Sequence, residues 1–212
     1  MILILVGLSI VSYLLGSIPT AIWYGDRYHG IDIRQHGSGN AGATNTFRVL
    51  GKKAGSIVLF VDALKGFAAA SLATVMYTFG FVDWQTCITL KILFGFLAII
   101  GHLLPVFCDF KGGKGVATIL GMALAIQPIV ALICIIVFLI TLFTTRFVSL
   151  SSMLAGIVFM VLILFIYNEK EKSYRIFAII VALLLVITHQ KNIGRLINGK
   201  ENKAPLFKKD RK

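Results

Sequence analysis

The chain has 212 residues, of which 58% are hydrophobic and only 14% are charged, and its 21 Lys and Arg against 9 Asp and Glu give a net charge of +12. Soluble domains are typically about 45–50% apolar and about 25% charged, so this composition indicates a protein that crosses a membrane several times. It excludes a soluble enzyme, a disordered tail and a nucleic-acid-binding module.

Six apolar runs divide the chain, and a bilayer span needs roughly 20 apolar residues. The runs cover residues 2–24, 56–80, 86–104, 116–143, 148–167 and 176–188. The fourth run is too long for one span and is interrupted by Gln127 and Pro128, where proline disfavours a continuous helix. We therefore predict an all-α polytopic membrane protein of seven transmembrane helices, with an uncleaved first span and a single membrane-embedded domain over residues 1–212.

The basic residues set the expected orientation, because Lys and Arg accumulate in cytoplasmic loops. With the N-terminus outside, the cytoplasmic segments hold 16 of the 21 Lys and Arg; these segments are 25–55, 105–115, 144–147 and the tail from 189. With only six spans, the tail and its basic run 208–212 would face away from the other basic loops. We therefore expect seven spans and a cytoplasmic C-terminus.

The first polar stretch, residues 36–48, is rich in glycine and carries Ser38, Asn40, Asn45 and Arg48. Glycines allow a backbone to approach a ligand, turn amides can surround an anion, and arginine can bind phosphate with two parallel hydrogen bonds. Part of the stretch matches the GxGxxG pattern, but no strand or βαβ unit surrounds it, so we do not infer a dinucleotide site. The alternative is a glycine-rich turn whose arginine serves only topology.

The second polar stretch, residues 101–118, contains a glycine-rich loop that leads directly into an apolar helix. The loop consists of Lys111, Gly112, Gly113, Lys114 and Gly115. Two ammonium groups and the N–H groups at a helix start favour binding of an anion, most simply a phosphate. The spacing differs from that of a nucleotide P-loop. His102 alone could be a hydrogen-bonded residue at a helix end, and either lysine could contact lipid head groups.

The third polar stretch, residues 189–201, follows the last predicted span. His189, Asn192 and Arg195 would share one helical face, and Glu201 is the only acid. We expect Glu201 to hold a basic residue in place. The alternative for the whole stretch is a helix at the membrane surface whose cations contact lipid.

The remaining polar residues suggest no metal or cofactor. The four histidines are scattered, the spacing of metal-binding motifs is absent, and the three cysteines lie beside or inside apolar runs. Asp62 and Lys65 are three residues apart within the second span. We expect them to form a structural ion pair, with a functional role as the alternative.

The three polar stretches resemble the three signatures of the PlsY family, the bacterial acyl phosphate:glycerol-3-phosphate acyltransferases. The resemblance is carried by SGNAGATNTFR, GHLLPVFCDFKGGKGVAT and HQKNIGRLINGKE, and it covers the whole chain. It implies a seven-helix enzyme of the bacterial cytoplasmic membrane with its active site on the cytoplasmic face. The HxxxxD pattern of other glycerolipid acyltransferases is absent from the sequence.

The resemblance also assigns roles to individual residues. It implies that Ser38 and Arg48 are essential, that His189 and Asn192 are functional, and that Glu201 is structural. It implies a glycerol 3-phosphate pocket formed by the glycine-rich loop and His102. The catalytic candidates are therefore Ser38, Arg48, His102, His189 and Asn192. The substrate-binding candidates are Asn40, Asn45, Lys111, Gly112, Gly113, Lys114, Gly115 and Arg195.

The implied reaction transfers a fatty acyl group from acyl phosphate to the 1-hydroxyl of glycerol 3-phosphate, giving lysophosphatidate and inorganic phosphate. The expected partners are these two substrates, membrane lipids and the enzyme that makes acyl phosphate; nucleic acid is not among them. Because acyl phosphate is already activated, no acyl-enzyme intermediate is needed. The alternative is a membrane transporter of an organic phosphate, although transport sites usually lie near the bilayer midplane at a repeat interface.

Overall fold

The computed structural model describes residues 1–167 and 171–204, and all regular secondary structure in these residues is helical. The all-α prediction is therefore confirmed for this part of the chain, and the basic run 208–212 lies outside it. The chain forms two compact units, Met1–Ile129 and Val130–Lys212. Each unit is described by itself below.

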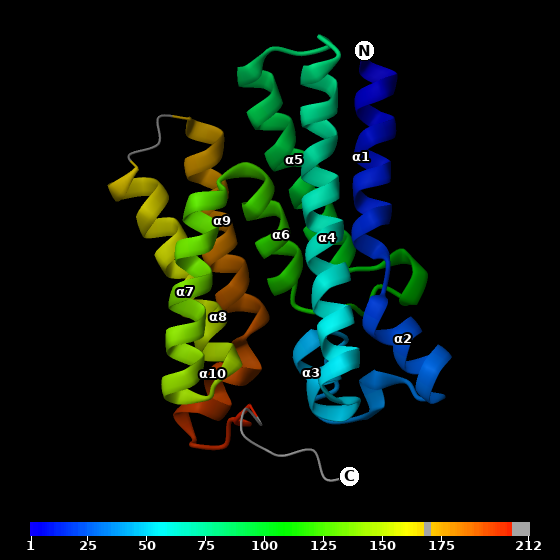
Figure 1. The fold of residues 1–212 in the computed structure, drawn as a ribbon, viewed down its shortest axis with the longest axis vertical. Coiled ribbons are helices and arrows are strands. Elements are labelled where there is room, and N and C mark those ends of the chain that lie inside the picture. The colour runs from blue at the N-terminus through cyan, green and yellow to red at the C-terminus, as the bar shows by residue number, and fades with distance from the viewer. Residues whose placement is uncertain (168–170, 205–212) are drawn as a thin grey trace. The chain divides into compact units, whose positions relative to one another are not determined.

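Three long helices form the body of the first unit: α1 (Ile2–Ser17), α4 (Gly51–Thr78) and α5 (Trp84–Leu103). Figure 1 shows α1, α4 and α5 running alongside one another, and all three pairs are in contact. Shorter helices complete the unit: α2 (Thr20–His29), α3 (Ala43–Val49) and α6 (Val116–Ile126). The first two polar stretches both belong to this unit.

The first predicted span is broken. The apolar run 2–24 was expected to be one helix, but α1 ends at Ser17 and α2 starts at Thr20, with a bend of 44° between them. Pro19 at the break has no backbone N–H to continue the hydrogen-bond ladder. The carbonyl of Ile18 instead accepts a hydrogen bond from Lys65 Nζ at 3.0 Å. The same carbonyl also accepts from the backbone N–H of Thr20 at 3.0 Å, so a buried lysine from α4 adds a second hydrogen bond to the backbone at the break.

Close helix packing in the first unit depends on glycine. A Cβ atom at Gly16 of α1 would overlap the carbonyl oxygen of Ala98 in α5, and one at Gly121 of α6 would overlap that of Ala63 in α4. Small residues let helix backbones approach closely, as is common in membrane proteins. This packing fixes α5 and α6, whose facing ends carry the glycine-rich loop.

Within its described residues, the second unit contains four α-helices: α7 (Pro128–Thr145), α8 (Val148–Val161), α9 (Lys172–Thr188) and α10 (Gln190–Ile197). The first two residues of α7 are assigned to the first unit. A π-helical turn, Leu162–Ile166, extends α8. The predicted break at Gln127 and Pro128 is confirmed, since α6 ends at Ile126 and α7 begins at Pro128. Residues 190–197 are helical as expected, and α10 is bent by 60° from α9.

Four helical segments of the described residues are individually long and apolar enough to cross a membrane: Gly51–Thr78, Trp84–Cys108, Pro128–Thr145 and Val148–Ile166. The bent pairs α1 with α2 and α9 with α10 raise the number to six if each pair counts as one span. The helix α6, with 11 residues, is apolar but shorter. The protein is therefore a multi-pass membrane protein, and the count of seven and the orientation remain predictions.

Candidate active site

The side chain of Asn45 holds the first polar stretch in its folded form. Its Oδ1 accepts a hydrogen bond from the backbone N–H of Ser38 at 2.8 Å, and its Nδ2 donates to the carbonyls of Ile33 at 3.0 Å and His36 at 2.9 Å. Asn45 is fully buried. In this structure the side-chain amide of Asn45, a predicted substrate-binding residue, is bonded to the loop backbone.

The other polar candidates of this stretch lie nearer the surface. Ser38 is exposed, while Asn40 and Arg48 are half-buried, the latter in the last turn of α3. Ser38 lies between Gly37 and Gly39, whose φ angles of 61° and 74° fall in the left-handed region that glycine adopts without penalty. Ser38 therefore lies exposed in a tight turn, and Asn45 holds the backbone of that turn by hydrogen bonds.

The glycine-rich loop folds back onto the end of α5. The N–H of Gly112 donates to the carbonyl of Leu103, and that of Gly113 donates to the carbonyl of His102, both at 3.1 Å. These two loop amides hold the loop against α5, whereas the anion site predicted from the sequence uses the N–H groups at the start of the following helix and the two lysines. Gly115 starts α6 with φ of 78°. Lys111 is exposed and Lys114 is half-buried on either side of the two glycines.

His102 and the loop are in direct contact. His102 is 7% exposed, and a Cβ atom at Gly113 would overlap its Nε2 and lie 2.9 Å from the carbonyl oxygen of Ala41. Only glycine fits between these groups. The structure therefore brings the first and second polar stretches together at Gly113.

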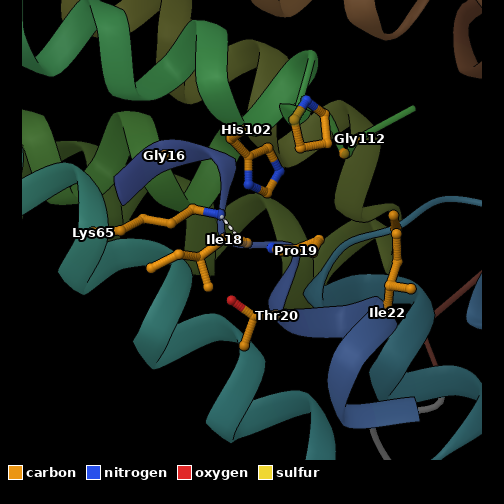
Figure 2. A pocket seen from close by; sticks show the side chains of 11 residues that line it. Gly16, Ile18, Pro19, Thr20, Ile22, Lys65, His102 and Gly112 are labelled. Carbon is orange, nitrogen blue, oxygen red and sulfur yellow. Dashed lines mark hydrogen bonds between the residues drawn. The ribbon is translucent and has the colours of Figure 1, made fainter. Parts of the chain in front are cut away.

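A pocket lies at this junction in the first unit. Its lining combines the α1–α2 break, the first polar stretch, the end of α5 and the glycine-rich loop. The lining residues are Gly16, Ile18, Pro19, Thr20, Ile22, Ala41, Lys65, His102, Pro105, Gly112 and Gly113. Figure 2 shows Lys65 extending from α4 to Ile18, with His102 and Thr20 on neighbouring elements. The pocket thus has a buried ammonium group and an imidazole in its wall.

The ion pair expected within α4 is confirmed. Lys65 Nζ lies 2.8 Å from Asp62 Oδ1, and the two side chains are only 3% and 2% exposed. Asp62 Oδ1 also accepts a hydrogen bond from Thr20 Oγ1 at 3.1 Å. Sequence reasoning placed neither Lys65 nor Thr20 at the candidate site, because the residues that surround them are distant in the chain.

In the second unit, Glu201 is the centre of a hydrogen-bond cluster. Its Oε1 accepts from Asn192 Nδ2 at 2.6 Å and from Ser149 Oγ at 2.9 Å, and its Oε2 accepts from Arg195 Nε at 2.8 Å. The structural role expected for Glu201 matches this geometry. Arg195, a predicted substrate-binding residue, is ion-paired with Glu201 through its Nε, and Ser149 was not identified from the sequence.

The surroundings of Glu201 keep its carboxylate charged. Burial raises its pKa, but the hydrogen bonds from Arg195, Asn192 and Ser149 together lower the pKa by more than burial raises it. The pKa of Glu201 therefore lies below its ordinary value. A charged Glu201 accepts all three hydrogen bonds at neutral pH. The cluster therefore fixes Asn192 and Arg195 on one side of α10.

His189 lies at the bend between α9 and α10 and is 3% exposed. Its Nδ1 lies 2.7 Å from the carbonyl oxygen of Leu185, which can only accept, so Nδ1 carries the proton and donates a hydrogen bond. In the neutral ring, Nε2 is then the basic nitrogen. Within residues 1–167 and 171–204, no group of three or more His, Cys, Asp or Glu side chains is arranged to hold a metal ion.

Together these features define an all-helical membrane protein with a glycine- and lysine-rich loop beside a partly charged pocket. A family model described as glycerol-3-phosphate acyltransferase matches residues 6–199. The chain belongs to this family and is an acyltransferase.

Curated relatives agree over almost the whole chain. A glycerol-3-phosphate acyltransferase 2 of Bacillus cereus is 47% identical, and the match covers 96% of this chain and 97% of the relative. The glycerol-3-phosphate acyltransferase of Chlorobium phaeobacteroides is 41% identical, with 95% and 97% covered.

Solved structures show the same fold. The crystal structure of PlsY (YgiH), an integral membrane glycerol 3-phosphate acyltransferase, in its glycerol 3-phosphate form has a TM-score of 0.81 and 40% identity, and the match covers 94% of each chain. The lysophosphatidic acid form of that enzyme has a TM-score of 0.79.

Proposed function

We propose that this enzyme transfers a fatty acyl group from acyl phosphate to the 1-hydroxyl of glycerol 3-phosphate, releasing lysophosphatidate and inorganic phosphate. This is the first step of bacterial phospholipid synthesis. The observation that carries the proposal is the junction of the first polar stretch, the glycine-rich loop and His102 around one pocket in a family member. The glycerol 3-phosphate form of the related structure supports this substrate.

The two substrates both carry phosphate, so the enzyme must hold two anions close together. Arg48, Lys111 and Lys114 supply cationic side chains in the first unit, and Arg48 can bind a phosphate with two hydrogen bonds. Ser38 and Asn40 of the first polar stretch supply neutral donors. Holding the reactants in place and offsetting their repulsion supplies most of the catalysis that an activated acyl donor requires.

The chemical step is a direct attack. The glycerol hydroxyl oxygen forms a bond to the acyl carbonyl carbon, and the bond from that carbon to the phosphate oxygen breaks with its electron pair leaving on phosphate. The hydroxyl proton passes to the departing phosphate or to an imidazole. His102 lies against the glycine-rich loop, so we assign it the contact with glycerol 3-phosphate. His189 and Asn192, which belong to the second unit, are the two catalytic candidates of the third polar stretch.

We further propose that residues 1–212 act as one catalytic domain with seven spans in the bacterial cytoplasmic membrane. The active site would face the cytoplasm, where 16 of the 21 basic residues would lie with the N-terminus outside. Membrane lipids and the enzyme that supplies acyl phosphate would be its partners.

The test uses purified protein in detergent with radiolabelled glycerol 3-phosphate and an acyl phosphate. Formation of lysophosphatidate without a sealed vesicle supports the enzyme and contradicts the transporter alternative. Acyl-CoA in place of acyl phosphate serves as the control donor and should give no product. Trapping of a labelled acyl group on Ser38 would refute direct attack.

A further inference from the structure

Two buried charged residues outside the three polar stretches form a cluster with His102 of the candidate site. It consists of Asp62 and Lys65 from α4 and His102 from α5, which are 2%, 4% and 7% exposed. Asp62 Oδ1 is 2.8 Å from Lys65 Nζ and 3.7 Å from His102 Nδ1. The carboxylate therefore faces both an ammonium group and an imidazole.

The carboxylate is held in place from a third element. Thr20 Oγ1, at the start of α2, donates to Asp62 Oδ1 at 3.1 Å, and Lys65 Nζ also donates to the carbonyl of Ile18 at 3.0 Å. These contacts tie the cluster to the α1–α2 break, and Figure 2 shows the one between Lys65 and Ile18. A buried ion pair gives little net stability against apolar residues of similar size, so stability alone does not account for this arrangement.

The two nitrogens of the His102 ring face different partners. Nδ1 faces the carboxylate of Asp62, and Nε2 lies against the α-carbon of Gly113 in the glycine-rich loop. A carboxylate beside one ring nitrogen keeps the proton there and leaves the other nitrogen basic, which is how an acid orients a catalytic histidine. A separation of 3.7 Å is longer than a hydrogen bond, and such contacts commonly shorten when substrate binds.

We propose that Asp62 is a positioning residue for His102: it fixes the orientation and tautomer of the imidazole so that Nε2 is presented to glycerol 3-phosphate at the glycine-rich loop. Lys65 and Thr20 hold the carboxylate at that place. The inference rests on the proposed function, because it concerns the same site. Asp62 acts through His102 and touches no substrate.

The test is a double-mutant cycle on purified enzyme, with kcat and KM measured for both substrates. Asp62→Asn should lower kcat roughly tenfold, within the range for directly coupled neighbours, and change KM little. In a His102→Gln background, the same Asp62→Asn change should have almost no further effect, because the group through which it acts is gone. An equal loss in both backgrounds overturns the proposal.

A double substitution that removes both charges of the ion pair distinguishes a loss of His102 positioning from a loss of folding. Asp62→Asn alone leaves Lys65 buried without its counter-charge, which can unfold the protein, so Asp62→Asn with Lys65→Met is measured beside it. This double variant should keep the thermal midpoint of the parent and still lose kcat roughly tenfold. A parental kcat in the double variant refutes the proposal. This comparison applies even if His102→Gln shows no turnover and the cycle cannot be completed.

The failure of the proposed function would look different. If that function is wrong, the parent enzyme forms no lysophosphatidate from acyl phosphate. If only the positioning role is wrong, the parent enzyme is active and the Asp62 substitutions fail the comparisons above.

Discussion

Asn45 Oδ1 accepts the backbone N–H of Ser38 at 2.8 Å across seven residues of chain. The same amide donates to the carbonyls of Ile33 and His36. One buried side chain thus closes the loop that presents the Ser38 hydroxyl.

Asn45→Ala is expected to destabilise the protein by about 1–3 kcal/mol, because it leaves buried backbone groups without partners. It should also lower kcat, since Ser38 loses its support. Thermal unfolding in detergent and initial rates measure the two effects. Thr44→Ala on the exposed side of α3 is the matched control. Parental rates in Asn45→Ala would show that Ser38 does not depend on this amide.

Replacing Arg48 or Lys114 by Ala should raise the KM for a phosphate substrate roughly ten- to a hundredfold or abolish turnover, because a hydrogen bond to a charged group contributes about 1.5–3 kcal/mol. Steady-state kinetics with each substrate varied in turn provide the measurement. Lys53→Ala removes an exposed charge in the first turn of α4 and controls for net charge. Unaltered kinetics in both variants would contradict charge neutralisation by these side chains.

The Glu201 cluster gives a pH dependence of stability with a definite sign. Its pKa is lower in the folded than in the unfolded protein, so its stabilising contribution is present above the unfolded value of about 4.3 and is lost as pH falls through the folded value. The thermal midpoint of Glu201→Gln should lie below that of the parent at pH 7, and the gap should narrow as pH falls below about 4.3. A gap that widens on acidification would refute this assignment.

Two glycines of α1 differ in what surrounds them. Gly16 lies against the Ala98 carbonyl oxygen, whereas a Cβ atom at Gly7 would meet no atom within 4 Å. Gly16→Ala should destabilise the protein by about 1–3 kcal/mol through overpacking, and Gly7→Ala should be neutral or slightly stabilising. Thermal midpoints in the same detergent compare them. Equal midpoints would mean that α1 and α5 can separate without cost.

The proposed orientation is testable by labelling of single cysteines after Cys87, Cys108 and Cys134 are replaced by Ala. Gln85→Cys lies at the start of α5 and should react with an impermeant maleimide from outside intact cells. Lys53→Cys at the start of α4 should react only after the membrane is opened. The reverse pattern would invert the orientation, and labelling of both from outside would contradict the span between them.

The sequence predicted helix boundaries where proline or glycine acts locally. The end of α6 before Pro128 and its start after Gly115 agree with these signals. Pro19 is a signal of the same kind, but the apolar run around it favoured one continuous span. At the break, the carbonyl of Ile18 also accepts a hydrogen bond from Lys65, which lies 47 residues away in the chain, and no local pattern indicates such a partner.

The polar stretches could be found from composition, but the direction in which each side chain points could not. Asn45 was predicted as a neutral hydrogen-bond donor to a substrate, and the sequence did not indicate that its side chain bonds to the backbone of the folded loop. Ser149 was missed because it meets Glu201 across 52 residues. In both cases the deciding partner is brought close only by tertiary structure.

The segment after α10 has a consequence for protein engineering. Glu201 receives three hydrogen bonds from the second unit, and the N–H of Ala204 donates to the carbonyl of Arg146 at 2.8 Å. Cleavage after Gly199 would therefore remove the acceptor of Asn192, Arg195 and Ser149 in one step. An affinity tag belongs beyond residue 204, and a protease that trims the tail should inactivate the enzyme only once it passes Glu201.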